Sequence, residues 1–243
     1  MKEFIVCSLL FLLVSCNNND SLFVSLPSNK TQIKFQNNLT STTDLNILNY
    51  LYYYNGAGVA AADFNNDGLA DLYFTGNQTA DKLYLNTGGL QFKDITKQAL
   101  INNSTPWTTG VTTVDINNDG FLDIYICKIG AHNSIKGNNL LYINEGPDIN
   151  GIPRFKEAAS FYGLDIASFA TQASFFDYDK DGDLDLFLMN HSLYPNSNYG
   201  KGSIRREVDQ MSGDKLFENK QGKFEDVTSQ SGIFQGKIGY GLG

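Results

Sequence analysis

The stretch DFNNDGLAD at residues 63–71 returns as DINNDGFLD at residues 115–123 and as DYDKDGDLD at residues 177–185. All three copies fit the pattern D-x-[ND]-x-D-G-x-x-D, with oxygen-bearing side chains at positions 1, 3, 5 and 9. Alternate side chains of such a tight loop converge on one point, and Ca²⁺ prefers a shell of about six to eight oxygen ligands. The glycines at position 6, Gly68, Gly120 and Gly182, permit a sharp turn with positive φ. The three copies therefore predict three calcium-binding loops.

Each loop offers the same set of predicted ligands. The side chains at positions 1, 3, 5 and 9 are Asp63, Asn65, Asp67 and Asp71 in the first copy, Asp115, Asn117, Asp119 and Asp123 in the second, and Asp177, Asp179, Asp181 and Asp185 in the third. Position 7 is expected to contribute its backbone carbonyl, as in EF-hand loops, which adds Leu69, Phe121 and Asp183.

Two other structures have to be weighed against a calcium loop between strands. A single copy would be equally typical of an acidic surface turn, because Asp, Asn and Gly are the usual turn residues; three complete copies favour the metal site. An EF-hand needs a bidentate Glu at position 12 and flanking helices. Position 12 is Phe74, Ile126 and Leu188 here, and the flanks are short apolar runs typical of strands.

The loop is one part of a longer repeat, whose copies lie 52 and 62 residues apart. Each copy contains four strand-like segments, which are residues 58–62, 71–74, 82–86 and 91–96, then 110–114, 123–126, 140–144 and 154–158, then 171–175, 185–188, 215–219 and 223–228. Four short strands per repeat are typical of one blade of a β-propeller. The sequence thus predicts an all-β fold, a partial β-propeller of three four-stranded blades plus the start of a fourth. Phe92, Phe155 and Phe224 are expected to pack between blades.

These segments resemble a known family, the FG-GAP or VCBS repeat of integrin-α-like propellers. The phrasing YLYYYNG at 50–56, DLYFTGN at 71–77 and SGDKLF at 212–217 is similar to that of envelope lipoproteins of Bacteroidetes type, which often carry an ASPIC/UnbV module. The resemblance covers about residues 31 to 243. It implies calcium roles for the Asp and Asn positions of all three loops. No ASPIC/UnbV segment is visible in this sequence.

The N-terminus reads as a targeting segment. Residues 1–16 contain an apolar run too short to span a bilayer and end in LVSC, which resembles a bacterial lipobox with Cys16 as the lipidated residue. An ordinary cleaved signal is the alternative. Lipidation predicts a membrane-anchored protein of the cell envelope, an outer-membrane lipoprotein.

The rest of the chain divides by repeat. Residues 17–30 are expected to be a flexible tether, 31–56 an N-terminal strand and lead-in, 57–101, 102–164 and 165–235 the three blades, and 236–243 the start of a fourth. The phrase at 31–37 echoes the fourth segment of the repeat, with Phe35 in the aromatic position, so a ring-closing strand is expected there.

Net charge and cysteine content indicate which classes of function fit this chain. The net charge of −8 comes largely from the ten carboxylates at ligand positions, and three bound Ca²⁺ would bring it to −2. This balance argues against nucleic-acid binding, which needs a Lys/Arg footprint; the doublet Arg205-Arg206 reads as a solvated loop pair. Cys127 lies alone in an apolar run of the mature chain and reads as a packing residue.

The sequence contains no recognisable catalytic motif, and its two histidines, His132 and His191, both fall in loops after second segments. We therefore expect a non-catalytic binding module for a glycan or protein ligand. Its contact surface is expected in the long loop at 192–213, with Tyr194, Pro195 and Tyr199. The alternative is the front part of a calcium-dependent polysaccharide lyase with its active site in a missing portion.

Overall fold

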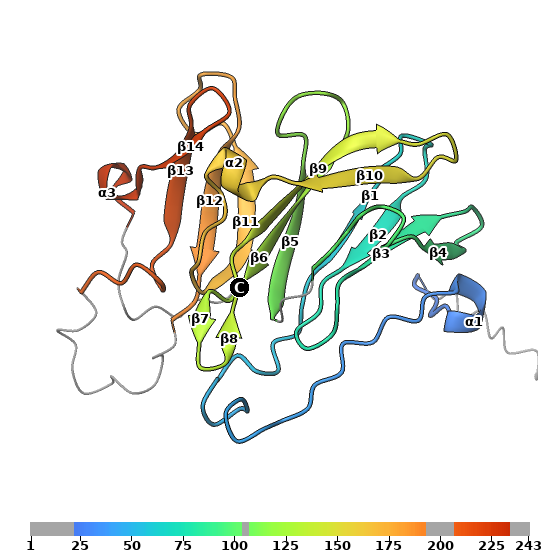
Figure 1. The fold of residues 1–243 in the computed structure, drawn as a ribbon, viewed down its shortest axis with the longest axis horizontal. Coiled ribbons are helices and arrows are strands. Elements are labelled where there is room, and N and C mark those ends of the chain that lie inside the picture. Colours follow the sequence, from blue (N-terminus) through green and yellow to red (C-terminus); the bar gives the residue numbers. More distant parts are fainter. Residues whose placement is uncertain (1–21, 104–106, 193–206, 234–243) are drawn as a thin grey trace, which may run out of the picture.

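The computed structural model describes residues 22–103, 107–192 and 207–233. In this part the chain forms three four-stranded antiparallel sheets and one two-stranded hairpin (Figure 1). The first sheet contains β1 (Val59–Ala62), β2 (Asp71–Phe74), β3 (Lys82–Asn86) and β4 (Phe92–Asp94). The second contains β5 (Thr108–Val114), β6 (Asp123–Lys128), β9 (Leu140–Pro147) and β10 (Pro153–Glu157), and the third contains β11 (Ala170–Phe176), β12 (Asp185–Asn190), β13 (Lys215–Asn219) and β14 (Phe224–Asp226).

The remaining described elements are small. The hairpin pairs β7 (Ala131–His132) with β8 (Ile135–Lys136), and the helices α1 (Ser28–Thr31), α2 (Ala159–Tyr162) and α3 (Thr228–Ser231) are each four residues long. No helix in the described ranges has the length and apolar character needed to cross a membrane.

Each large sheet follows the order of the chain, so neighbouring strands are joined in sequence. The same repeat positions pair in all three, since Leu72 lies opposite Tyr84, Ile124 opposite Tyr142 and Leu186 opposite Phe217. The prediction of an all-β fold with four strands per repeat is confirmed. No sheet in the described part of the chain closes on itself, so the propeller remains an interpretation of this arrangement.

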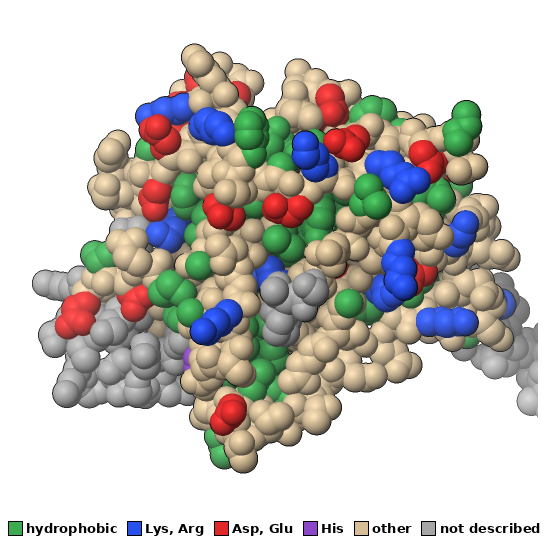
Figure 2. Space-filling model, in the orientation of Figure 1, with side chains coloured by type: hydrophobic (Ala, Val, Ile, Leu, Met, Phe, Trp, Pro, Cys, Tyr) green, Lys and Arg blue, Asp and Glu red, His purple; other side chains and the backbone are tan. Residues whose placement is uncertain are grey.

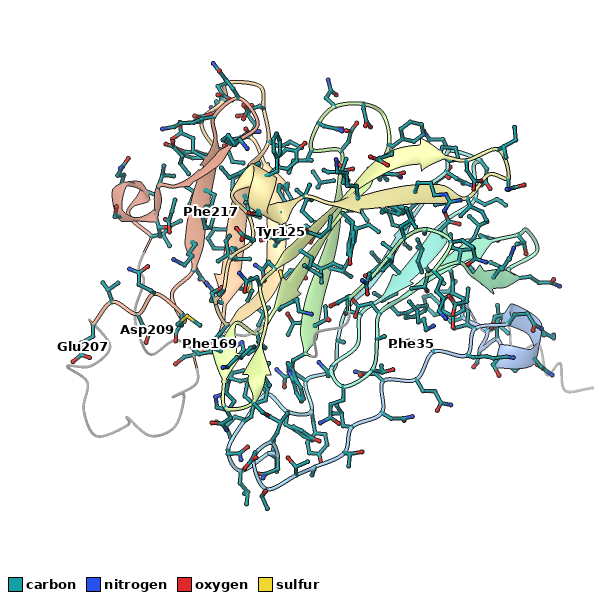
Figure 3. The ribbon with its side chains drawn as sticks, viewed as in Figure 1. Phe35, Tyr125, Phe169, Glu207, Asp209 and Phe217 are labelled. Carbon is teal, nitrogen blue, oxygen red and sulfur yellow. The ribbon has the colours of Figure 1, made fainter. Side chains whose placement is uncertain are left out.

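The three sheets pack face to face through two apolar clusters. The cluster between the first and second sheets contains Phe64, Leu83 and Phe155, and the cluster between the second and third contains Tyr125, Leu186, Phe217 and Phe224. Figure 3 shows Tyr125 and Phe217 in this second interface. Phe155 and Phe224 thus lie between sheets as predicted, whereas Phe92 is buried outside both clusters.

Burial along the second strands reflects this packing. All six residues of β6 are buried, because the second sheet is covered on both faces. In β2 burial alternates between full and partial, as expected for a strand with one covered face.

The first strands of the three sheets lie side by side and touch directly. Gly58 donates its backbone N–H to Thr109 O at 2.8 Å, and the Thr112 hydroxyl donates to Ala173 O at 2.7 Å. A Cβ at Gly58 would lie 3.0 Å from Thr109 O, and a Cβ at Gly110 would come well inside 3.0 Å of Thr171 O. Only small residues permit this approach of three backbones.

The N-terminal segment differs from its prediction, because residues 31–56 contain no strand. The backbone N–H of Lys34 donates to the Tyr84 hydroxyl, and that of Thr40 donates to the Gln78 side chain. These donors are therefore directed to side chains of the first sheet and not to a neighbouring strand. Phe35 stacks on Phe74 of β2 with ring centroids 5.1 Å apart (Figure 3).

Several predictions concern residues outside the described ranges. They are the targeting segment with Cys16, the contact residues Tyr194, Pro195 and Tyr199, the doublet Arg205-Arg206, and the start of a fourth repeat at 236–243.

Candidate metal-binding loops

Each D-x-[ND]-x-D-G-x-x-D loop joins the first strand of a sheet to the second, and the three loops lie along the upper edge of Figure 1. Asp and Glu side chains gather in the upper part of the face in Figure 2, with Lys and Arg among them. The N-terminal segment crosses the opposite, lower end of the sheets.

The three loops share one backbone shape. Position 6 has φ of 87°, 88° and 98° at Gly68, Gly120 and Gly182, which confirms the turn predicted for these glycines. Position 4 is also left-handed, with φ of 58° at Asn66 and 67° at Lys180. Asn accepts this conformation more readily than most residues, because its short polar side chain bonds locally.

The aspartate at position 1 holds each turn closed. Asp63 accepts the backbone N–H groups of Asp67 and Gly68 at 3.1 and 2.7 Å. Asp115 accepts those of Asp119 and Gly120 at 3.0 and 2.9 Å. Asp177 accepts the equivalent pair in the third loop, at 3.2 Å each.

The aspartate at position 9 is buried and ties the loop to its sheet. Asp123 accepts the backbone N–H of Ile116 at 3.0 Å and that of Asn144 at 2.7 Å, one on each carboxylate oxygen. Asp71 and Asp185 make the same pair of contacts. Burial raises the pKa of both Asp71 and Asp123 to about 6, although these N–H donors oppose the shift.

Position 3 distinguishes the third loop from the other two, because it is an aspartate there and an asparagine in the others. Carboxylate oxygens of Asp177, Asp179 and Asp185 all lie within 4.8 Å of one another. In the first two loops position 3 is an asparagine whose amide donates to the position-5 aspartate, at 2.9 Å from Asn65 and 2.8 Å from Asn117.

Two buried oxygens in these loops have no hydrogen-bond partner. They are Oδ1 of Asn65 and Oδ1 of Asp183. The pKa of Asp183 is raised, first by burial and then by the neighbouring carboxylates Asp181 and Asp185. Unpaired buried acceptors beside like charges suit a hard cation that takes oxygen ligands, so the residues present fit Ca²⁺. The backbone-carbonyl role of Leu69, Phe121 and Asp183 remains a prediction.

Sequence reasoning missed one residue of each site, the asparagine that ends the third strand. Asn144 donates its backbone N–H to Asp123 and its side-chain amide to Leu122 O and Phe64 O, and its Oδ1 accepts Gly146 N–H. Asn86 and Asn219 make the matching loop contacts. The signal was present, because all three third segments end in Asn.

The loops also contact each other. The side-chain amide of Asn66 donates to Gly120 O at 3.0 Å, which joins the first loop to the second. Asn65 donates to Gly151 O at 3.0 Å, in the β9–β10 turn of the neighbouring sheet. The second sheet therefore supports the first loop from outside.

Comparison with known proteins points to the same repeat. A family model described as an FG-GAP-like repeat matches residues 63–126, which include the first two loops. This match supports the predicted FG-GAP repeat, and such repeats indicate a ligand-binding or adhesion-type module.

Curated relatives share part of the chain. Cartilage acidic protein 1 from Homo sapiens is 33% identical over 136 residues, which is 55% of this chain and 20% of that protein. The proteins of the same name from Mus musculus and Xenopus tropicalis are 32% identical over 136 and 139 residues, or 55% and 56% of this chain. The chain spans about a fifth of the length of these relatives. The kinship with Bacteroidetes lipoproteins and the ASPIC/UnbV association remain predictions.

Proposed function

We propose that this chain is part of a calcium-stabilised propeller that acts as a non-catalytic binding or adhesion module for a glycan or protein ligand. The observation that carries the proposal is the threefold loop, which has one backbone shape at the same end of three adjacent sheets. Lipidation at Cys16 would hold the module at the cell envelope, on the outer membrane.

The propeller is supported by the way in which the sheets meet. Four-stranded antiparallel sheets packed face to face, with their first strands innermost, are the arrangement of propeller blades. Here β5 packs against both β1 and β11. The close contacts at Gly58 and Gly110 are what an axis crowded by first strands requires.

Calcium is supported by the chemistry of the loops. When bound, Ca²⁺ would balance the negative charges that Asp177, Asp179 and Asp185 bring close together. The residues of the chain would orient the ligand oxygens. Asp63 and Asp115 already accept backbone N–H groups of their own loops, and these hydrogen bonds hold the turns in shape. Preformed loops of this kind lower the conformational entropy lost on binding.

A binding role is favoured over catalysis by the two histidines. His191 is buried against Tyr50, and burial lowers the pKa of its imidazole to about 4. Burial raises the pKa of Tyr50. A general acid or base works best with a pKa near the working pH. The pKa of His191 lies too low and that of Tyr50 too high to meet this condition. His132 lies in the hairpin, with Nε2 at 3.0 Å from Asn49 O.

The test is the effect of calcium on stability and on ligand binding. A metal bound only by the native state raises the melting temperature, so we expect a higher midpoint in Ca²⁺ than in EGTA. Asp119→Ala should remove one calcium per chain in titration calorimetry. Equal melting curves in Ca²⁺ and in EGTA would contradict the calcium proposal.

The binding role is tested by two screens of the full protein. A glycan array and capture of protein partners should yield a saturable ligand, and incubation with soluble polysaccharides should leave them intact. Release of unsaturated oligosaccharides would contradict the non-catalytic proposal.

A further inference from the structure

A cavity lies at the end of the first strands opposite the loops. Its volume is about 290 Å³, close to the lower end of the range for small-molecule sites, roughly 300–1,000 Å³. Its walls come from the N-terminal lead-in and from the starts of β1, β5 and β11. The lining includes the side chains of Tyr50, Tyr52, Asn55, Trp107, Gln172 and His191.

Aromatic rings form one wall of this pocket and hold each other in place. Trp107 packs edge-on against Tyr50 with ring centroids 5.4 Å apart. The Tyr50 hydroxyl lies 3.3 Å from His191 Nε2, and Tyr52 packs over the His191 ring at 4.1 Å. Tyr50 and Trp107 are buried, whereas Tyr52 is half-buried and accessible to a ligand.

The wall contains one buried polar atom with no partner, Nδ1 of His191. The Tyr50 hydroxyl lies 3.3 Å from His191 Nε2, so Nε2 has a partner and Nδ1 does not. Buried polar groups are almost always paired, so an unpaired ring nitrogen in a pocket wall points to a polar group brought by a ligand.

The pocket is also lined by polar, uncharged side chains. The Asn55 side chain is exposed, and Gln172 donates from its amide nitrogen to the Thr112 hydroxyl, leaving Oε1 toward the pocket side at Gly110. Among the described residues that line the cavity there is no Asp, Glu, Lys or Arg. The described lining residues therefore offer no counter-ion to a charged ligand.

We infer that this pocket binds one ring of a neutral sugar. Tyr52 would lie against the apolar C–H face of the ring, and the amides of Asn55 and Gln172 would meet its hydroxyls. The inference rests on the proposed binding function, and it gives that function a ligand class and a site. The volume admits a single sugar unit, so the pocket recognises a chain end or a branch.

Ligand binding in the pocket can be followed by tryptophan fluorescence, because Trp107 is the single tryptophan of the chain. The full protein is titrated with methyl glycosides of glucose, galactose, mannose and N-acetylglucosamine into the millimolar range. We expect a saturable change in tryptophan fluorescence with at least one of them. Tyr52→Ala and Asn55→Ala should each weaken that binding at least tenfold.

The matched control is Tyr54→Ala. Tyr54 is 65% exposed, packs edge-on against Tyr53 and does not line the pocket, so its removal should leave sugar binding unchanged. Circular dichroism and melting in Ca²⁺ check that all three variants fold. Since Asn55 is exposed and its side chain has no hydrogen bond to a described residue, Asn55→Ala is a suitable second variant if Tyr52→Ala fails to fold.

Three results would overturn the inference. One is the absence of any saturable response across the panel. Another is glycan binding that both pocket variants retain, which would leave the proposed binding function intact and place it elsewhere. The third is saturation by tetramethylammonium in place of the sugars, which would mean an aromatic cation site. Failure of the calcium proposal is read separately, from equal melting in Ca²⁺ and EGTA.

Discussion

Gly110 is where the packing of the second sheet on the third can be tested most directly. It lies in β5, and a Cβ at this position would come well inside 3.0 Å of both Thr171 O and Gln172 Oε1. The Gln172 oxygen ends a flexible side chain and can move away. The Thr171 carbonyl is backbone of β11, so Gly110→Ala must push two strands apart until the contact reaches an ordinary 3.4 Å or more.

Two opposing effects set the magnitude. Overpacking of this kind typically costs about 1–3 kcal/mol, and a backbone shift belongs in the upper half of that range. Gly110 does not have a positive φ, so alanine would otherwise stabilise by about 0.4–1 kcal/mol through the unfolded chain. The net loss is about 2 kcal/mol, which corresponds to a melting temperature about 4–8 °C lower for a chain of this size.

The assay is thermal and urea unfolding in excess Ca²⁺, with Gly58→Ala as the graded control. A Cβ at Gly58 would lie 3.0 Å from Thr109 O, a milder conflict at the same place in the repeat. We expect Gly58→Ala to lose less stability than Gly110→Ala. A Gly110→Ala protein that melts at the wild-type temperature or above would refute the close packing of first strands, since without it alanine should stabilise.

Three other outcomes are expected. Asn144→Ala should lose about 1–3 kcal/mol in Ca²⁺ and in EGTA alike, because it leaves Phe64 O and Leu122 O without a donor; a loss seen only in Ca²⁺ would contradict the structural role. Between pH 6.5 and 4 wild type should lose about 3 kcal/mol relative to His191→Gln, because unfolded His191 takes up a proton near 6.5 and folded His191 only near 4; urea unfolding of both proteins at each pH gives this difference, in which the opposite contribution of Asp71 and Asp123, common to both, cancels. Cys16→Ser should release the protein from the membrane fraction, and continued retention with normal processing would point to another attachment.

The sequence was sufficient for the parts of the fold that repeat. The strands at 71–74 and 82–86 have the observed bounds, because apolar alternation and a flanking glycine-bearing turn are local signals that recur in every copy. The left-handed turn at position 6 is equally local, since the glycines Gly68, Gly120 and Gly182 predict it directly. The position-4 residues were not foreseen, because Asn118 and Lys180 carry no common turn signal beyond their place in the loop.

Features that depend on neighbours could not be read in this way. The phrase around Phe35 resembles the fourth strand of the repeat, but a strand also needs an adjacent edge, and the donors of this segment meet Tyr84 and Gln78 side chains. The pocket could not be predicted from the sequence either. It joins residues near 52, 107, 172 and 191, which share no period and meet only because three first strands begin at the same end.

The first strands run from the pocket end of the sheets to the loop end, and these two ends differ in charge. At the loop end, carboxylates such as Asp179 and Asp185 crowd together, so that end gains from a cation. At the pocket end the described lining residues are uncharged, and the strands are fixed by contacts that need no ion, such as the hydrogen bond from Thr109 Oγ1 to Ala170 O at 2.7 Å. Loss of calcium should therefore loosen the loops before it moves the pocket walls. If the proposed calcium and sugar sites are both occupied, we expect them to be coupled only through the positions of the sheets, and weakly as long as the close contact at Gly110 holds.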